Sequence, residues 1–396
     1  MEEIKRVQLS EVAELITKGT TPTTIGFEFQ EQGVNFLKIE CFDENGGFIK
    51  SKVGHISEEC NEKLKRSQLK EGDLLFSIAG AIGRVAIVTK EMLPANTNQA
   101  LAIIRIVNEQ IYLPYIRLIL TSPIVIEQFE RKKQGVAQLN LSLKDINEIS
   151  IPLPSKEKQI ELADLFKKVV NIIYKKKEEL LALDDLVRGR FVEMFGDPVV
   201  NSKGWIESSL SEKLNVLGGY AFKSDQFDEI DGIPVLRIGN INAGYFKPVN
   251  MVYWKEDKSL ERYAMYPGDL VMSLTGTVGK DDYGNVCILG NNYKMYYLNQ
   301  RNAKLEIKDG IDKYYLSQLL KFEPMKKRLT GISRGVRQAN ISNKDILNLV
   351  VPVPPIELQN QFAAFVHQIN KSKLIVQKEL DETQLLFDSL MQEYFG

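Results

Sequence analysis

Two stretches of the chain place hydrophobic residues at spacings that alternate between four and three. The first begins at Leu162 and ends at Met194, and the second begins at Phe362 and ends at Tyr394. This spacing is typical of a helix that packs against another helix in a coiled coil. The residues predicted to form the interface between the helices, or with a partner, are Leu162, Phe166, Val169, Ile173, Leu180, Leu183, Val187, Phe362, Val366, Ile369, Val376, Leu380, Phe387 and Leu390.

Each pattern predicts one helix of roughly 38 residues, which is about 57 Å long at 1.5 Å per residue. A lone helix cannot bury its apolar stripe, so the two helices are predicted to pack on each other. The intervening chain must return, which favours an antiparallel pair with one globular domain at each end. Polar residues interrupt the pattern at Lys176, Arg190, Lys373 and Thr383, and we expect them to fix the helix register. Apolar residues of these helices that do not face the other helix could bind helices of a partner protein. Ordinary core packing explains any single leucine equally well.

The remaining residues alternate short β-rich runs with turn signals such as adjacent glycines. Strands are predicted at residues 36–40, 74–78, 85–88 and 100–106, with counterparts in the second half of the chain. Helices are predicted at residues 112–134 and 311–329. This mixture indicates an α+β fold.

The chain repeats itself once. Residues 135–146 match residues 335–346, and the match continues without a gap to the last residues of each copy. Upstream, Gly72-Asp-Leu-Leu-Phe-Ser matches Gly268-Asp-Leu-Val-Met-Ser at an offset of 196 instead of 200, so an insertion or deletion separates the copies. A single repeat of this length predicts two homologous α/β domains with a pseudo-two-fold relation. The predicted parts are a first domain (1–155), a central long helix and junction (156–199), a second domain (200–355) and a C-terminal long helix (356–396).

Composition and motifs exclude several classes of function. The 51 basic and 52 acidic residues nearly cancel, the three cysteines are too scattered for a disulfide framework, and the two histidines exclude His-rich zinc chemistry. The sequence has no apolar run long enough to span a membrane and no signal peptide, so we expect a cytoplasmic protein. The motifs of dinucleotide loops, P-loops, serine hydrolases and zinc proteases are missing. We therefore expect no catalytic residue and no metal ligand, and Asp281-Asp282 is expected to be solvated surface.

Two basic segments carry the main functional signal. Residues 326–344 contain six positive charges and no acid, and residues 131–144 contain four and no acid. Arg and Lys neutralise phosphates, whereas Gln and Asn form paired hydrogen bonds with adenine, and Arg does so with guanine. Another explanation is a solvated loop that leads into a short helix, because Ser142-Leu-Lys-Asp and Ser342-Asn-Lys-Asp are typical of helix capping boxes.

Two further regions are candidates for DNA contact. Residues 273–280 form a predicted strand–turn–strand with hydroxyls and glycines, whereas the corresponding residues 77–84 are largely apolar. Aromatic residues near Gly218-Gly219 lie beside a lysine, and burial of these rings is an equal alternative. The predicted DNA-binding residues are Lys38, Arg84, Arg131, Lys132, Lys133, Gln138, Asn140, Lys144, Tyr220, Lys223, Arg237, Ser273, Thr275, Thr277, Lys280, Arg301, Arg334, Arg337, Gln338, Asn340 and Lys344.

These motifs carry a resemblance to a known family. The order Gly-Asp-Leu, Ser-x-x-Gly-x-x-Gly, Asn-Gln, Gln-x-Asn-(Ile/Leu)-Ser-x-Lys-Asp-Ile and (Ile/Val)-Pro-(Leu/Val)-Pro occurs twice and resembles the specificity subunit of type I restriction–modification systems. Residues 190–198 followed by Lys203-Gly-Trp205 resemble the junction before the second recognition domain of such subunits. The apolar Ile78-Ala79-Gly80-Ala81 and Leu139 depart from the pattern, which leaves the base-reading residues of the first domain less defined.

The resemblance implies two target recognition domains that read the two halves of a bipartite, asymmetric site in duplex DNA. It also implies two partner methyltransferase subunits and motor–nuclease subunits. S-adenosylmethionine, ATP and magnesium are then expected only in those partners, with no cofactor in this chain. The rival interpretations are a stand-alone enzyme, which the missing catalytic motifs disfavour, and a two-headed protein-interaction scaffold without DNA specificity, which the basic segments disfavour.

Overall fold

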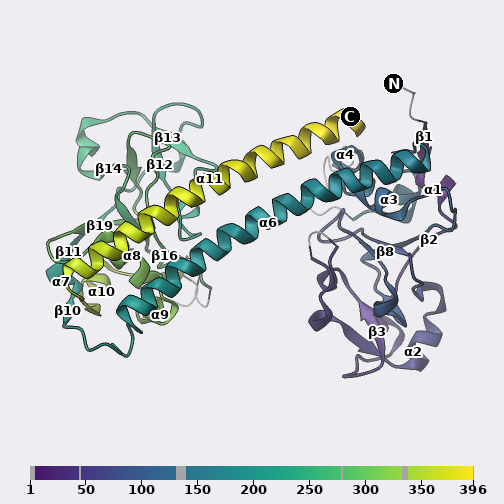
Figure 1. Cartoon of the computed structure of the whole chain (residues 1–396), viewed down its shortest axis with the longest axis horizontal. Helices are drawn as coiled ribbons and strands as arrows, with labels where there is room; N and C mark the ends of the chain where they lie inside the picture. The colour runs from purple at the N-terminus through teal and green to yellow at the C-terminus, as the bar shows by residue number, and fades with distance from the viewer. Residues whose placement is uncertain (1–4, 44–45, 131–139, 278–279, 332–337, 396) are drawn as a thin grey trace. The chain divides into compact units, whose positions relative to one another are not determined.

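The computed structural model describes residues 5–43, 46–130, 140–277, 280–331 and 338–395 (Figure 1). The chain divides into two compact units. The first unit contains Met1–Lys177 together with Lys378–Gly396, and the second contains Glu178–Gln377. Each unit therefore combines one globular domain with parts of both long helices, and each is described separately below.

The first unit is built on two sheets. An antiparallel four-stranded sheet has the order β2 (Leu15–Lys18), β8 (Leu101–Arg105), β5 (Leu74–Ser77), β6 (Val85–Ile87). A three-stranded sheet has the order β4 (Gly54–Ile56), β3 (Val34–Leu37), β7 (Ala95–Thr97), in which β3 and β7 are parallel. A small sheet pairs β1 (Arg6–Gln8) with β9 (Ser150–Pro152). The short helices are α1 (Leu9–Val12), α2 (Glu58–Lys63), α3 (Leu113–Leu120), α4 (Pro123–Glu130) and α5 (Leu143–Asn147).

The second unit repeats this plan. One four-stranded sheet has the order β11 (Leu214–Gly218), β19 (Asn302–Ile307), β15 (Leu270–Ser273), β17 (Val286–Ile288), and the other has the order β13 (Val252–Trp254), β12 (Ile233–Leu236), β18 (Tyr296–Leu298), β14 (Ala264–Met265). Two small sheets pair β10 (Glu207–Ser209) with β21 (Val350–Pro352), and β16 (Thr275–Thr277) with β20 (Gln338–Asn340). The short helices are α7 (Leu210–Lys213), α8 (Lys313–Lys321), α9 (Glu323–Thr330) and α10 (Asn343–Leu347). The mixed fold and the predicted duplication are both confirmed.

The helices predicted at residues 112–134 and 311–329 are each two helices, so that prediction of continuity is wrong. In the first unit the break lies between α3 and α4, where Pro123 starts the second helix. In the second unit the backbone at Phe322 is extended, and a proline occupies the first turn of α9. Proline lacks the N–H that would continue the preceding helix, and it is favoured in the first turn of a new one, so the chain turns at both places.

The two long helices are confirmed. Helices α6 (Lys156–Phe195) and α11 (Ile356–Phe395) have 40 residues each. In the first unit the ring of Phe166 in α6 lies 5.5 Å from those of Phe387 and Phe395 in α11. In the second unit Phe191 in α6 lies 5.6 Å from Phe362 in α11. In each unit the early part of one helix meets the late part of the other, so the helices are antiparallel.

The predicted heptad residues lie along these helices, and Phe166 contacts Phe387 of the opposite helix. Most are buried, and Leu180, Leu183, Phe387 and Leu390 are partly buried; the buried members are Leu162, Phe166, Val169, Ile173, Val187, Phe362, Val366, Ile369, Val376 and Leu380. The lysines that interrupt the pattern pair with acids of the opposite helix. Lys176 lies 2.7 Å from Glu379 in the first unit, and Lys373 pairs with Asp184 in the second. These two lysines therefore meet charges that favour this register. Arg190 pairs with Glu193 and Thr383 donates to the carbonyl of Glu379, both within their own helix, so neither is expected to fix the register.

No helix in the described part of the chain is both long and apolar enough to cross a membrane.

Candidate nucleic-acid interface

The two candidate DNA-contact segments of the second domain meet in a two-stranded sheet. Strands β16 and β20 pair so that Thr275 lies opposite Asn340 and Thr277 lies opposite Gln338. The next backbone link runs from the amide of Ile341 to the carbonyl of Leu274, at 2.8 Å. Residues separated by about sixty positions in the chain therefore share one small surface. Neither segment alone predicts this pairing.

Five of the residues predicted in these two segments have exposed or half-buried side chains. Thr277, Lys280, Asn340 and Lys344 are exposed, and Thr275 is half-buried. The prediction that Ser273 contacts DNA is wrong, because Ser273 is fully buried at the end of β15. Its hydroxyl accepts a hydrogen bond from the backbone N–H of Asn285 at 3.1 Å, so its role here is to shape the turn.

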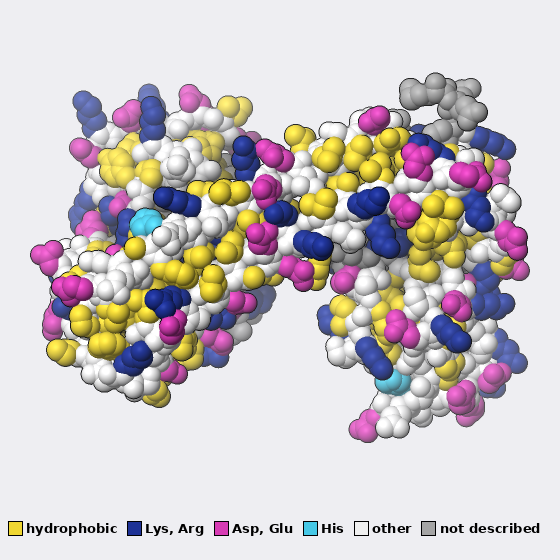
Figure 2. Space-filling model, in the orientation of Figure 1, with side chains coloured by type: hydrophobic (Ala, Val, Ile, Leu, Met, Phe, Trp, Pro, Cys, Tyr) yellow, Lys and Arg dark blue, Asp and Glu magenta, His cyan; other side chains and the backbone are white. Residues whose placement is uncertain are grey.

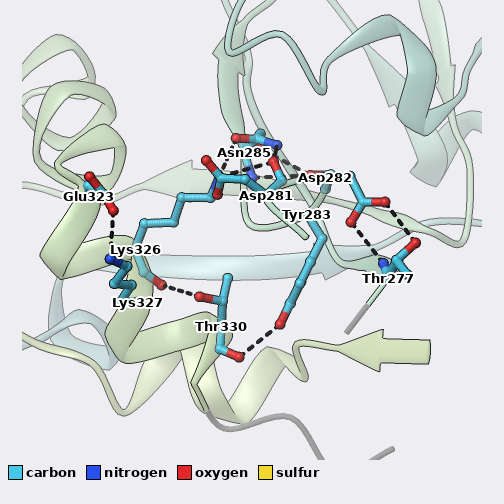
Figure 3. A network of polar contacts seen from close by, with 10 residues as sticks. Thr277, Asp281, Asp282, Tyr283, Asn285, Glu323, Lys326, Lys327 and Thr330 are labelled. Carbon is cyan, nitrogen blue, oxygen red and sulfur yellow. Dashed lines mark hydrogen bonds and ion pairs between the residues drawn. The ribbon is translucent and has the colours of Figure 1, made fainter. Parts of the chain in front are cut away.

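A buried lysine ties the turn after β16 to helix α9 (Figure 3). Lys326 is only 7% exposed, and its ammonium donates to Asp281 Oδ1 at 2.5 Å and to Asn285 Oδ1 at 2.7 Å. From the same turn, the Tyr283 hydroxyl donates to the carbonyl of Thr330 at 2.8 Å. A buried cation is tolerated only where it is paired and hydrogen-bonded, so this contact depends on both acceptors. We call these five residues the clasp.

Asp282 organises the other side of the same turn. Its carboxylate accepts the backbone N–H of Thr277 at 2.8 Å and the Thr277 hydroxyl at 2.9 Å. The Thr277 N–H is the main reason that the pKa of Asp282 lies below its ordinary value. Gly276 is required here because an added Cβ would lie 2.3 Å from Asp282 Oδ1. Asp281 is exposed, as predicted, and Asp282 is half-buried. Both carboxylates also hold the turn, a role that the prediction of solvated surface did not include.

The first domain keeps the framework of this site without the clasp. The amide of Leu141 donates to the carbonyl of Ile78 at 2.9 Å, as Ile341 does to Leu274. Leu74 pairs with Ile87, whereas Leu270 pairs with Ile288, so the second domain has five more residues between these strands. The position of Lys326 in α9 is occupied in α4 by Ile126. The five additional residues between β15 and β17 are the feature of the sequence that could have indicated the clasp.

Several predicted residues lie outside the described residues or have no described side chain. Arg131, Lys132, Lys133 and Gln138 of the first domain, and Arg334 and Arg337 of the second, lie outside the described residues. Gln338 belongs to β20, but its side chain is not described. These residues stay predictions.

The segments that follow the basic loops are helix starts, as the capping motifs predict. Ser142 accepts the N–H of Asp145 at 3.2 Å, and the Asp145 carboxylate accepts the N–H of Ser142 at 2.8 Å. Ser342 and Asp345 repeat the arrangement in the second domain. Asn140 and Lys144 are exposed at the first of these starts, and the Lys144 ammonium lies 3.7 Å from Glu148.

The remaining predicted residues are scattered over the two domains. Arg301, Lys223 and Arg237 are exposed, Arg84 is half-buried, and the guanidinium of Arg237 donates to a backbone carbonyl. Lys38 is half-buried 3.8 Å from Glu40. The visible face of the molecule shows Lys and Arg interspersed with Asp and Glu (Figure 2), as the near-zero net charge predicts.

The aromatic region of the second domain is mostly a packed cluster. Tyr220 is 38% exposed, and its ring lies 5.0 Å from Phe222 and 5.4 Å from Tyr263. Phe222 itself is buried. Tyr220 is therefore the aromatic residue near Gly218-Gly219 whose ring is accessible to a ligand. The described residues contain no group of three or more His, Cys, Asp or Glu side chains that could hold a metal ion.

Comparisons with known proteins place these observations in context. Residues 1–182 and 202–383 each match the family described as the type I restriction modification DNA specificity domain. The chain is 26% identical over 269 residues to the MjaVIII specificity subunit of Methanocaldococcus jannaschii, which covers 63% of the chain and 62% of that protein. It is 33% identical over 134 residues to the EcoBI specificity subunit of Escherichia coli, which covers 33% of the chain and 27% of that protein. It is 23% identical over 406 residues to the putative MjaX specificity subunit of M. jannaschii, with 95% and 89% covered.

The chain thus spans less than two thirds of the length of the first two relatives. Two solved structures are similar in fold. One is the S subunit of a type I restriction-modification system from M. genitalium, with a TM-score of 0.55, 15% identity, and 100% of this chain and 97% of that chain covered. The other is a chain of a type I R-M system solved to explain complex assembly and conformational transition, with a TM-score of 0.56, 17% identity, and 98% and 96% covered.

Proposed function

Because the chain belongs to the type I restriction modification DNA specificity family, we propose that it is the DNA-recognition subunit of a type I restriction–modification complex. Each domain reads one half of a bipartite, asymmetric site in duplex DNA. The alternative of a scaffold without DNA specificity is disfavoured, because the family match covers both copies of the repeat.

The observation that carries this proposal is the pairing of β16 with β20. This pairing brings Thr275 opposite Asn340 and Thr277 opposite Gln338. Amide and hydroxyl groups read base edges, whereas Arg and Lys hold phosphates and fix the register on the duplex. Lys280 and Lys344, both exposed, add cations at either side. The clasp holds this surface in one conformation, which lowers the entropy cost of binding.

In this proposal the chain itself catalyses nothing. Two methyltransferase subunits supply the S-adenosylmethionine chemistry, and motor–nuclease subunits supply the ATP- and magnesium-dependent steps. The apolar side chains left exposed on the long helices, among them Leu181, Leu186, Leu374 and Leu385, are the proposed seats for the methyltransferases. Helices α6 and α11 set the separation of the two half-sites.

The direct test is to sequence the methylome of a host that carries this protein with its methyltransferase partner. The expected result is a bipartite motif with an unread spacer. The Thr277→Ala variant should change one half of the motif only, and the Asn140→Ala variant should change only the other half. The absence of any methylated motif, or a change in both halves from either variant, would contradict the assignment of one domain to each half.

Binding to random duplex DNA at several salt concentrations separates the DNA reader from the scaffold. A protein that neutralises several phosphates loses affinity linearly on a log–log plot against salt. A flat line for the purified chain would favour the scaffold. The same assay with a neutral polymer is the control.

The role of the helices is tested by lengthening both. Four residues inserted at matched positions of α6 and α11 add about 6 Å, which corresponds to roughly two base pairs at 3.4 Å each. The methylated motif should gain about that much spacer. An insertion in one helix alone is the control for disrupted packing. An unchanged spacer in the doubly lengthened protein would contradict the proposal that the two helices set the separation of the half-sites.

A further inference from the structure

The first domain contains a pocket that the proposed interface does not use. Its volume is about 560 Å³, and it lies where the chain leaves β2 and where helix α2 continues into the 3-10 turn at Lys65–Ser67. Thr20 and Ser67 contribute hydroxyl-bearing side chains, and Lys63 and Arg66 contribute cations. Ile25 and Phe27 contribute apolar surface. This volume lies within the range of sites that hold small molecules, about 300–1,000 Å³.

The second domain fills the same place with aromatic rings. Thr20 corresponds to Tyr220, because their amides bond to the equivalent carbonyls of Thr97 (3.2 Å) and Leu298 (2.9 Å) in β7 and β18. Ser67 corresponds to Tyr263, because each is the last residue of the 3-10 turn that precedes the next strand. In the second domain these two rings pack 5.4 Å apart. The pocket therefore exists because Thr and Ser stand where the second domain has two tyrosines.

The chemistry of the pocket fits a charged ligand with an apolar body. Lys63 and Arg66 are exposed, and neither has an ion pair recorded among the residues that the structure describes. The Ser67 hydroxyl already donates to the carbonyl of Leu64 at 3.2 Å, so the cations carry most of the available polar recognition. Phe27 and Ile25 present an aromatic ring and an aliphatic side chain that are not fully buried. Cations of this kind bind phosphate, whereas a ring and an aliphatic chain pack against a base.

We propose that this pocket binds one phosphorylated nucleoside unit. Lys63 and Arg66 hold the phosphate, and Phe27 and Ile25 contact the base. The unit comes either from the bound DNA strand or from a free nucleotide. In the first case the inference rests on the proposed function and gives the first domain a DNA contact for which the second domain has no space.

The test uses the full chain and a variant borrowed from the second domain. Thr20→Tyr with Ser67→Tyr fills the pocket with side chains that the homologous fold already accommodates. Lys63→Gln with Arg66→Gln removes the phosphate ligands and leaves the volume unchanged. Lys65→Gln is the matched control, because this lysine lies in the same turn, pairs with Glu62 at 3.4 Å and does not line the pocket.

The probes are the four deoxynucleoside 5′-monophosphates and a random duplex, measured by calorimetry and fluorescence anisotropy. If the unit comes from DNA, both double variants weaken duplex binding about tenfold, the control changes it less than twofold, and the mononucleotides bind weakly. If the unit is a free nucleotide, both double variants abolish binding of a mononucleotide and leave duplex affinity unchanged. Unchanged binding of all probes by both double variants overturns the pocket proposal. Failure of the proposed function gives a different result from failure of the pocket proposal. In that case the unmodified chain itself shows no salt-dependent binding to the duplex.

Discussion

The turn between β5 and β6 in the first domain and the turn between β15 and β17 in the second are built on the same frame but are held differently. Both frames end in an amide-to-carbonyl bond, Leu141 to Ile78 and Ile341 to Leu274. The first turn is short and apolar, with glycines of positive φ at Gly80 and Gly83. The second has five more residues and is fixed by the clasp. The comparison teaches that the sheet supplies the position of this surface, while inserted residues supply its chemistry and its rigidity.

The strongest way to break this comparison is to delete residues 280–284, so that the second turn has the length of the first. Asp281, Asp282 and Tyr283 are lost, and with them the contacts to Thr277, Lys326 and Thr330. We expect specific affinity for the cognate site to fall by about 10³-fold or more, towards non-specific binding. Competition binding with cognate and scrambled duplexes measures this. Retention of specificity would show that the insert is dispensable.

A smaller change replaces Lys326 by isoleucine, the residue at the same position in the first domain. Asp281 and Asn285 then lose their shared donor, and we expect a loss of about 1–3 kcal/mol in the free energy of unfolding. Urea unfolding of the full chain measures it. The matched control is Ile126→Val in the first domain, which should change the free energy of unfolding by less than about 0.5 kcal/mol, because Ile126 is 38% exposed. A smaller effect of Lys326→Ile than of the control would mean that the clasp adds no stability.

The charges at the two helix starts sharpen the comparison further. Lys144 faces Glu148, whereas the corresponding position near Lys344 is Asn348, and no ion pair of Lys344 is recorded in the described part of the chain. Lys344→Gln should reduce the salt slope of DNA binding by about one. Lys144→Gln should reduce it less, because Glu148 already offsets that charge. Equal slopes for the two variants contradict this difference.

The Asp282 carboxylate predicts a small pH effect that only the second turn shows. Its folded pKa lies below the unfolded value, so its bond to Thr277 contributes stability above about pH 4, the ordinary pKa of an aspartate. This contribution is lost as the pH falls through the lower, folded pKa. The amide resonance of Thr277 should titrate with this carboxylate in NMR spectra. Asp282→Asn should remove the titration, and an Asp282 pKa at or above its ordinary value would contradict the proposed contact.

The smallest effect concerns the thiols, which should be alike in both domains. Burial raises the pKa of Cys41 and Cys60 in the first domain, and it raises the pKa of Cys287 in the second to about 12. All three thiols are therefore neutral at pH 8 and should react with an alkylating reagent only after unfolding. Mass spectrometry of native and denatured protein measures the labelling. Rapid native labelling of any one of them would identify a local opening of its domain.

The features that could be predicted from sequence are those with a local or periodic signal. The long helices follow from heptads in which apolar residues such as Leu162, Phe166 and Val169 alternate at spacings of four and three. The capping boxes follow from Ser142 and Asp145, which are three residues apart. The helix breaks were missed because the hydrophobic pattern continues through Pro123. The continuous apolar pattern predicts one helix. In the structure, α3 ends before Pro123 and α4 starts at it, because proline lacks the N–H that would continue the first helix.

The site was predicted in parts but not as a whole. Thr277 and Asn340 were both identified, yet their union depends on a strand pairing between segments that are distant in the chain. Lys326 belongs to the basic segment predicted at residues 326–344, whereas in the structure it is buried and bonded to Asp281. Ser273 shares its residue type with surface hydroxyls, and only the β15 register shows that it points inwards. Such facts depend on tertiary contacts that no local pattern encodes.

The ion pair between Lys373 of α11 and Asp184 of α6 has a consequence for which helices of the duplicated chain associate. Repeat symmetry places Ile173 at the position of Lys373, and Gln384 at the position of Asp184. If α6 associated with α6 of another molecule, Asp184 would meet isoleucine, and if α11 associated with α11, Lys373 would meet glutamine. This ion pair therefore favours association of α6 with α11 over association of either helix with its own copy, whereas in a pair of α6 helices Lys176 would still find Glu179 at the position of Glu379.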